Sequence, residues 1–152
     1  MLISEMLQKK YQAKPYVAVT CDASDEISKA VACMAEHNIG AVVVLEDDSI
    51  VGIFTERDLM RGLHSTGTDY LSGRLKSNMI TKVIIMNPDQ SMDEALDLMN
   101  ANRIRHLPVV DRNQLVGLLS IRDLIAQKLD QVKSTTEFLQ QQVQVGSKPL
   151  PM

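Results

Sequence analysis

The sequence is poor in aromatic residues and in cysteine: it has no tryptophan, 3% aromatic residues and two cysteines. Cys21 and Cys33 lie twelve positions apart, which fits neither a CxxC motif nor a zinc-ligand spacing. The three histidines form no HxxxH pair, so we expect no metal requirement. Neither thiol has a partner base nearby in the sequence, and no glycine-rich phosphate loop is present. We therefore expect that the chain is not an enzyme.

Long apolar runs and an excess of positive charge are also missing. No apolar run reaches the roughly 18–20 residues of a membrane span, and Met1–Lys10 lacks the apolar centre of a signal peptide. Lys and Arg number 16 against 19 Asp and Glu, a net charge of −3. Because proteins that contact many nucleic-acid phosphates are usually basic, we expect a cytoplasmic protein with neither a nucleic acid nor a membrane as partner.

The most informative feature of the sequence is an internal repeat. Shifted by 65 positions, the chain aligns with itself without a gap from about residue 18 to about residue 125. Identical pairs include Ala30 with Ala95, Met34 with Met99, Ile39 with Ile104, Val44 with Val109, Val51-Gly52 with Val116-Gly117, and Arg57-Asp58-Leu59 with Arg122-Asp123-Leu124. A single register over this length indicates two copies of one structural unit.

Each copy predicts the same series of elements, β-α-β-β-α. In the first copy these are a strand at 16–20, a helix from 27, strands at 41–45 and 50–54, and a helix from Thr55. In the second they are a strand at 83–86, a helix opened by Ser91 and Glu94, strands at 106–110 and 115–119, and a helix from Ser120. The fold class is therefore α+β, with strands and helices mixed. A unit of roughly 50 residues has a marginal core, so we expect the two copies to pack face to face.

Four strings, two in each copy, carry a family resemblance. They are MAEHNIGAVVV at Met34–Val44, GIFTERDL at Gly52–Leu59, NRIRHLPVVD at Asn102–Asp111 and LVGLLSIRDL at Leu115–Leu124. The chain resembles a tandem pair of cystathionine-β-synthase (CBS) domains, a Bateman module, over about residues 3–128. The resemblance implies two CBS repeats packed with pseudo-two-fold symmetry, two clefts between them, adenine-nucleotide ligands and frequent dimerisation. We expect an N-terminal helix and linker at 1–15, repeats at 16–64 and 82–129, a connecting segment at 65–81, and a C-terminal helix extension with a disordered tail at 130–152.

A hydroxyl and an acid stand three residues apart at the start of the last helix of each copy. These pairs are Thr55 with Asp58 and Ser120 with Asp123. A carboxylate there can accept hydrogen bonds from the 2′- and 3′-hydroxyls of a ribose, and free N–H groups of the helix start can bind phosphate. The simpler interpretation is a capping box alone. The family resemblance favours the ribose, because the family holds ribose with the matching acid.

The resemblance also implies that each cleft combines the acid of one repeat with a strand of the other. The first cleft would hold Thr55, Arg57, Asp58, Lys82, Ile85, Arg105 and His106. The second would hold Ser120, Arg122, Asp123, Thr20 and Ala41. The first is richer in positive charge, so we expect a phosphorylated ligand to prefer it.

The C-terminal segment carries a separate signal. Ile125, Leu129, Val132, Thr136, Leu139 and Val143 step by 4, 3, 4, 3 and 4, a heptad seam with one polar member. The segment predicts either a helix that pairs with a second subunit or a helix that docks on its own domain and then frays. Beyond Val145 we expect disorder.

Two functions remain after these exclusions. One is a non-enzymatic regulatory module that binds AMP, ADP, ATP or NAD, or S-adenosylmethionine, and whose ligand shifts an equilibrium read by an unknown regulated protein. The other is a homodimeric interaction module with empty clefts. The intact Thr55–Asp58 and Ser120–Asp123 pairs favour the first, and the heptad seam favours the second.

Overall fold

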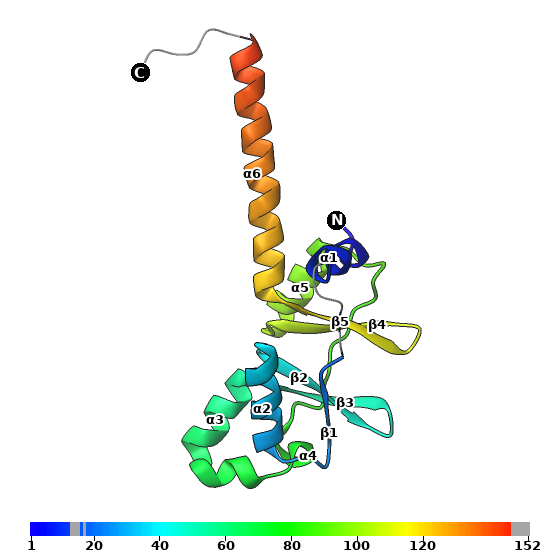
Figure 1. The fold of residues 1–152 in the computed structure, drawn as a ribbon, viewed down its shortest axis with the longest axis vertical. Coiled ribbons are helices and arrows are strands. Elements are labelled where there is room, and N and C mark those ends of the chain that lie inside the picture. The colour runs from blue at the N-terminus through cyan, green and yellow to red at the C-terminus, as the bar shows by residue number, and fades with distance from the viewer. Residues whose placement is uncertain (13–15, 17, 147–152) are drawn as a thin grey trace.

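The structure is a computed structural model that describes residues 1–12, 16 and 18–146. Figure 1 shows two small halves, one above the other, with a long C-terminal helix rising from the upper half. Each half mixes helices and strands, so the predicted α+β class is confirmed. Among the described helices, none combines the length and the apolar character that crossing a bilayer requires.

The lower half is the first repeat, and it follows the predicted order. Its elements are β1 (Thr20–Asp22), α2 (Ile27–His37), β2 (Ala41–Glu46), β3 (Ser49–Thr55) and α3 (Glu56–Thr66). β2 pairs with β1 in parallel and with β3 antiparallel. The hairpin turns through Asp47 and Asp48, whose φ angles of 52° and 63° are those of a type I′ turn. Ile27 of α2 and Phe54 of β3 are fully buried and join the core of this half.

The upper half is the second repeat, with one strand fewer. It contains α5 (Met92–Asn102), β4 (His106–Asp111), β5 (Gln114–Ser120) and α6 (Ile121–Gly146). The hydroxyl of Ser91 accepts a hydrogen bond from the N–H of Glu94 at 3.1 Å, which confirms the predicted cap of α5. The carboxylate of Glu94 accepts instead from the side chain of Gln90, at 2.9 Å.

The first strand of each repeat differs from its prediction. The strand expected at 16–20 begins only at Thr20, and the strand expected at 83–86 is reduced to one bridge, Met86 with Val109. In the first repeat Thr20 pairs with Val43. The position of Val43 is taken in the second repeat by Pro108, which has no N–H to donate to an adjacent strand. The pairing of Thr20 with Val43 therefore has no counterpart between Ile85 and Pro108, and only the bridge at Met86 remains.

The segment at 65–81, expected only to connect the repeats, is part of the first half. It forms the 3₁₀ helix η1 (Thr68–Ser72) and the short helix α4 (Leu75–Asn78). Leu75 is fully buried in the core of the first repeat, and its N–H donates to the carbonyl of Asp25 at 2.9 Å. The ring of Tyr70 fills the space above Gly62, where a Cβ would collide with it.

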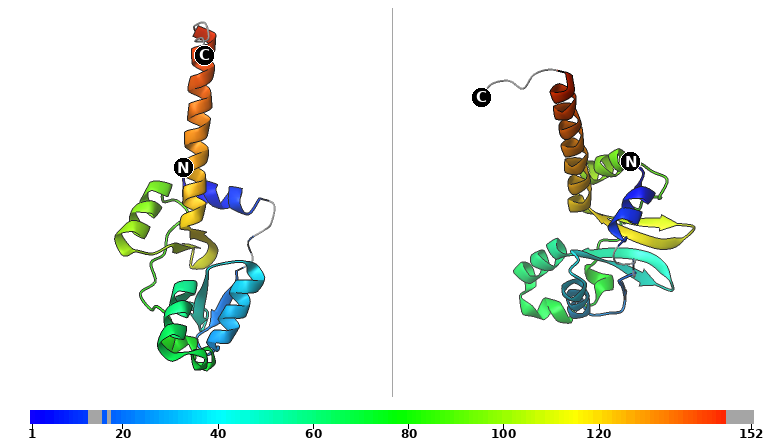
Figure 2. Two further views of the ribbon diagram at one scale, coloured as in Figure 1. Left: turned by 90° about the vertical axis from the view of Figure 1, so that its left-hand side faces the viewer. Right: turned by 45° about the horizontal axis from the view of Figure 1, so that its top comes forward.

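The predicted N-terminal helix is confirmed as α1 (Ile3–Lys10) and packs on the second half. Its residues Ile3, Met6 and Leu7 are buried in the core of that repeat. From Leu124, which is fully buried, α6 continues away from both halves (Figures 1 and 2). The disorder predicted beyond Val145 does not include Gly146, which belongs to α6, and residues 147–152 lie outside the described residues.

Candidate functional site

The two predicted hydroxyl–acid pairs lie at the starts of α3 and α6 in matching geometry. The hydroxyl of Thr55 accepts from the N–H of Asp58 at 3.3 Å, and Oδ2 of Asp58 accepts from the N–H and the hydroxyl of Thr55, both at 2.9 Å. In the second repeat the corresponding backbone bonds are 3.2 Å to the Ser120 hydroxyl and 2.8 Å to Oδ2 of Asp123. The capping role of both pairs is thus confirmed, and each carboxylate is held in one orientation.

Asp58 faces a cleft of about 380 Å³ between the two repeats. Six of the seven residues predicted for this cleft line it: Thr55, Arg57, Asp58, Lys82, Arg105 and His106. Ile85 does not line it, and its side chain is 48% exposed. The lining residues that were not assigned to this cleft from the sequence are Gly40, Ile53, Glu56, Arg61, Ile80, Val83, Ile84, Asn102, Arg103 and Ile104.

The lining of this first cleft divides into a charged part and an apolar part. Five cationic side chains, Arg57, Arg61, Lys82, Arg103 and Arg105, accompany two acids, Glu56 and Asp58. Ile53, Ile80, Val83, Ile84 and Ile104 form an apolar wall. A more open groove of about 530 Å³ against α5 shares Arg57, Arg103 and Arg105 with the cleft. The arrangement suits a ligand with an apolar face, hydroxyl groups and negative charge.

His106 lies where the two repeats meet. A Cβ at Gly40 would come within 3.1 Å of its Nε2, so the glycine of the first repeat makes room for the imidazole of the second. Burial lowers the pKa of His106 below its ordinary value, and Lys10 and Arg105 act in the same direction. His106 therefore contributes a neutral imidazole at neutral pH.

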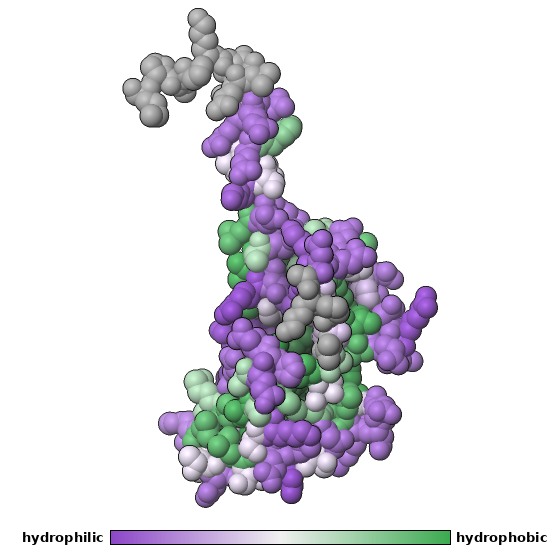
Figure 3. Space-filling model, in the orientation of Figure 1, coloured by the Kyte–Doolittle hydropathy of each residue, from purple (hydrophilic) through white to green (hydrophobic). Residues whose placement is uncertain are grey.

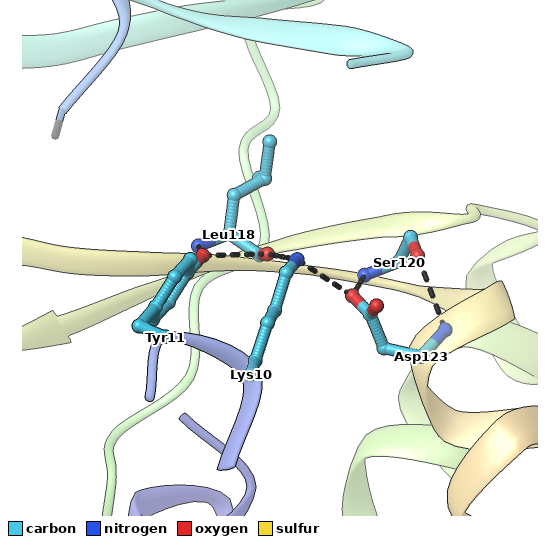
Figure 4. A network of polar contacts seen from close by, with 5 residues as sticks. All are labelled: Lys10, Tyr11, Leu118, Ser120 and Asp123. Atoms are coloured by element: carbon cyan, nitrogen blue, oxygen red, sulfur yellow. Dashed lines mark hydrogen bonds and ion pairs between the residues drawn. The ribbon is translucent and has the colours of Figure 1, made fainter. Parts of the chain in front are cut away.

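The acid of the second repeat is engaged by the chain itself. Nζ of Lys10 lies 2.7 Å from Oδ2 of Asp123 and donates to the carbonyl oxygen of Leu118 at 2.6 Å (Figure 4). The hydroxyl of Tyr11 accepts from the N–H of Leu118 at 3.3 Å and donates to its carbonyl at 3.4 Å. The ring of Tyr11 in turn packs on Tyr16, with 4.9 Å between centroids.

The other residues predicted for the second cleft differ in their exposure to solvent. Ala41 is fully buried and presents no surface to a ligand, Thr20 is half-buried, and Arg122 is exposed. Sequence reasoning missed Lys10 and Tyr11, which lie outside the repeat and carry no motif. Two more polar side chains at the end of a helix that already contains Ser4, Glu5 and Gln8 gave no distinct signal.

The cysteines and histidines do not form a reactive site in the part of the chain that the structure describes. No three His, Cys, Asp or Glu side chains there gather closely enough to hold a metal ion. Cys21 is buried, with its sulfur 3.9 Å from that of Cys33. Burial and the neighbouring Cys33 raise the pKa of Cys21 to about 12, so the thiol is a poor nucleophile at neutral pH.

Comparison with known proteins agrees with the repeat and the fold. The CBS domain family model matches residues 10–65 and 73–130. The chain belongs to the CBS domain family. It is 30% identical over 149 residues to the mitochondrial CBS domain-containing protein CBSX3 of Arabidopsis thaliana, covering 95% of this chain and 72% of that protein.

Solved CBS-domain structures share this fold. A signal-transduction protein with CBS domains from Burkholderia ambifaria is 36% identical, with a TM-score of 0.77 over 86% of this chain and 95% of that one. The CBS domain pair of protein MJ0100, solved with 5′-methylthioadenosine and S-adenosyl-L-methionine, is 21% identical, with a TM-score of 0.74 over 86% of this chain and 98% of that one. The present chain is a CBS-pair regulatory module.

Proposed function

We propose that this CBS pair is a non-enzymatic cytoplasmic sensor that binds an adenine nucleotide, AMP, ADP, ATP or NAD, in the first cleft. The observation that carries the proposal is the fixed carboxylate of Asp58 at the start of α3, inside a cleft that is lined by both cationic and apolar side chains. These three features correspond to the three parts of a nucleotide: ribose, phosphate and base.

The ribose contact rests on Asp58. Its Oδ2 is held by the N–H and hydroxyl of Thr55, and its Oδ1 accepts no hydrogen bond from any described residue. A carboxylate fixed in this way can accept a ribose hydroxyl without first losing side-chain freedom. The N–H groups of the first turn of α3 and the guanidinium of Arg57 lie beside it and suit phosphate oxygens.

Charge favours a phosphorylated ligand over S-adenosylmethionine. The cleft lining has five cationic side chains against two acids, and His106 is neutral. A sulfonium cation would add to that positive charge, whereas each phosphate reduces it. The adenosine ligands of the MJ0100 CBS pair support an adenosine moiety in general, and the charge of this cleft supports the phosphates.

A ligand in the first cleft would touch both repeats. Thr55 and Asp58 come from the first, and Arg105 and His106 come from the second. Binding therefore favours the arrangement of the halves that closes the cleft, and a regulated partner protein that recognises this arrangement would respond to the nucleotide.

Isothermal titration calorimetry with AMP, ADP, ATP, NAD and S-adenosylmethionine tests the proposal. For the preferred nucleotide, Asp58→Asn should weaken binding at least about tenfold, because it removes a charge-assisted hydrogen bond. Asp111→Asn, an exposed carboxylate at the end of β4, is the matched control and should bind as wild type does. Wild-type affinity in Asp58→Asn would refute the assignment of the site.

A homodimeric interaction module is the second candidate, favoured by the surface of α6. Leu129 and Val132 are 64% and 61% exposed, and Ile125 and Leu139 continue the same heptad seam. Green, apolar side chains interrupt the hydrophilic surface of this helix in Figure 3. Val143, the last predicted member of the seam, has no described side chain.

Light scattering during size-exclusion chromatography tests the homodimer. Wild type should elute with the mass of a dimer, and Leu129→Glu should be monomeric because it buries a charge in the seam. Ser134→Glu adds the same charge on the opposite side of α6 and should remain dimeric. A dimer that survives Leu129→Glu would exclude this seam as the interface.

A further inference from the structure

The end of α1 is fixed over the second repeat by both packing and polar contacts. Leu7 lies directly on Gly117, where a Cβ would be 2.6 Å from its Cδ2. Lys9 pairs with Asp130 of α6 at 3.0 Å and donates to the buried Gln127 at 3.2 Å. The following residue, Lys10, is thereby directed to Asp123.

The backbone N–H and carbonyl of Leu118, which Lys10 and Tyr11 hydrogen-bond, have a counterpart in the first repeat. Leu118 corresponds to Ile53 under the 65-residue shift. The N–H and carbonyl of Ile53 pair with the backbone of Ile80, at 2.9 and 3.0 Å. In the second repeat the Tyr11 hydroxyl and the Lys10 ammonium take these two places at Leu118. Side chains of α1 thus replace a backbone segment.

This replacement changes what the matched acid can bind. Beside Ile53, the backbone pairing with Ile80 leaves Asp58 without a cationic partner among the described residues. Beside Leu118, the ammonium of Lys10 is within 2.7 Å of both the carbonyl and Asp123. The side chains of Lys10 and Asp123 are 32% and 26% exposed, so the ion pair is partly shielded from water.

We propose that the side chain of Lys10 occupies the second cleft. Its ammonium takes the place of a ribose at Asp123 and so limits the module to one nucleotide per chain. The proposal rests on the nucleotide function proposed above and adds the residue that determines which cleft binds. A nucleotide that enters the second cleft must displace Lys10 from Asp123 and from Leu118, and it then leaves the Leu118 carbonyl without its donor.

Calorimetric titration with AMP, the part that all the candidate nucleotides share, tests this proposal through the stoichiometry. Wild type should bind one AMP per chain. Lys10→Met, which keeps the aliphatic stem and removes the charge, should bind a second AMP, and Lys10→Met combined with Asp123→Asn should lose that second site. Lys10→Ala removes the whole side chain and should behave as Lys10→Met does.

Lys128→Met is the matched control, because it removes the same charge and one ion pair from the second repeat and leaves Lys10 paired with Asp123. It should bind one AMP. Circular dichroism establishes that each variant is folded. Binding of two AMP molecules by wild type would overturn the proposal. It would also be overturned if neither Lys10→Met nor Lys10→Ala bound more AMP than wild type does, including the case in which wild type and both variants bind none.

The two proposals fail in different ways. If wild type binds no AMP and Lys10→Met binds one in an Asp123-dependent manner, the proposed role of Lys10 is supported and the nucleotide site at Asp58 is refuted. If wild type binds one AMP through Asp58 and the Lys10 variants bind no second AMP, the nucleotide site at Asp58 is supported and the proposed role of Lys10 is refuted.

Discussion

The two repeats carry the same hydroxyl–carboxylate pair at the same helix start but present it to different surroundings. Asp58 lines a cleft of about 380 Å³, whereas Asp123 is ion-paired with Lys10 at 2.7 Å. The repeated sequence is the same at both places, Arg-Asp-Leu after a hydroxyl-bearing helix start. The difference comes from segments outside the repeat, which are not duplicated in the chain and so differ between the two halves.

The same segments complete the two hydrophobic cores. Leu75, from the segment between the repeats, is fully buried in the first core, and Ile3 of α1 is fully buried in the second. Each repeat by itself is too small to bury enough apolar surface, so each takes a side chain from a neighbouring helix. In the second repeat the helix that completes the core also brings Lys10 to the cleft.

The largest expected effect comes from removing these two side chains. Leu75→Ala and Ile3→Ala should each lower the free energy of unfolding by about 2–5 kcal/mol, since each leaves a cavity in a packed core. Urea unfolding followed by circular dichroism measures both. Met60→Ala, a large apolar side chain that is 65% exposed on α3, should change it by about 0.5 kcal/mol or less. If one of the two core variants matched this control, its repeat would not depend on the added helix.

Alanine substitution at two matched glycines should lower stability less than the core substitutions do, and by unequal amounts. Gly52 and Gly117 correspond under the repeat, and each is covered by an added segment, Met79 in one case and Leu7 in the other. A Cβ at Gly52 would also meet the backbone oxygen of Ile80 at 3.0 Å, whereas a Cβ at Gly117 meets only side chains. Both alanine variants should lose about 1–3 kcal/mol of stability.

Gly52→Ala should lie at the upper end of that range, because a backbone oxygen moves less easily than the flexible side chain of Leu7. The same urea unfolding experiment ranks the two variants. A larger loss for Gly117→Ala would mean that α1 is the more rigid of the two covering segments.

The features that the sequence predicted correctly depend on residues close together in the chain or on the repeat. The capping pairs, the hairpins and most of the first cleft follow from residue spacing or from the family resemblance, and Thr55, Asp58 and Arg105 lie where they were expected. Pro108 alone could have indicated that the pairing of Thr20 with Val43 has no counterpart in the second repeat, because a residue without an N–H cannot donate to a parallel neighbour.

The occupied second cleft could not be predicted in this way. Lys10 is 113 positions from Asp123 in the chain, and a lysine at the end of a helix is most simply explained by the helix dipole. The packing of Leu7 on Gly117 and the contacts of Lys9 with α6 fix the direction of α1 and so the place of Lys10. Long-range contacts made by a single unrepeated segment leave no periodic signal in one sequence.

The smallest expected effect is a pH dependence at His106, the residue where the two clefts meet. Burial lowers its pKa, with Lys10 and Arg105 acting in the same direction and Glu56 and Asp123 opposing them. The unfolded chain therefore binds a proton at pH values where the native protein does not. Its contribution to stability is complete above the ordinary value of 6.5 and is lost as the pH falls from there through the lowered pKa of the folded state.

Thermal unfolding of nucleotide-free protein between neutral and mildly acidic pH measures this loss. His106→Gln keeps a polar side chain at the position and should flatten the acid side of the profile, whereas His64→Gln, on the exposed end of α3, should leave the profile as in wild type. An unchanged profile in His106→Gln would mean that its proton affinity is the same in the folded and unfolded states. Since Lys10 faces His106 as well as Asp123, Lys10→Met should raise the pKa of His106 and narrow the pH range over which stability is lost.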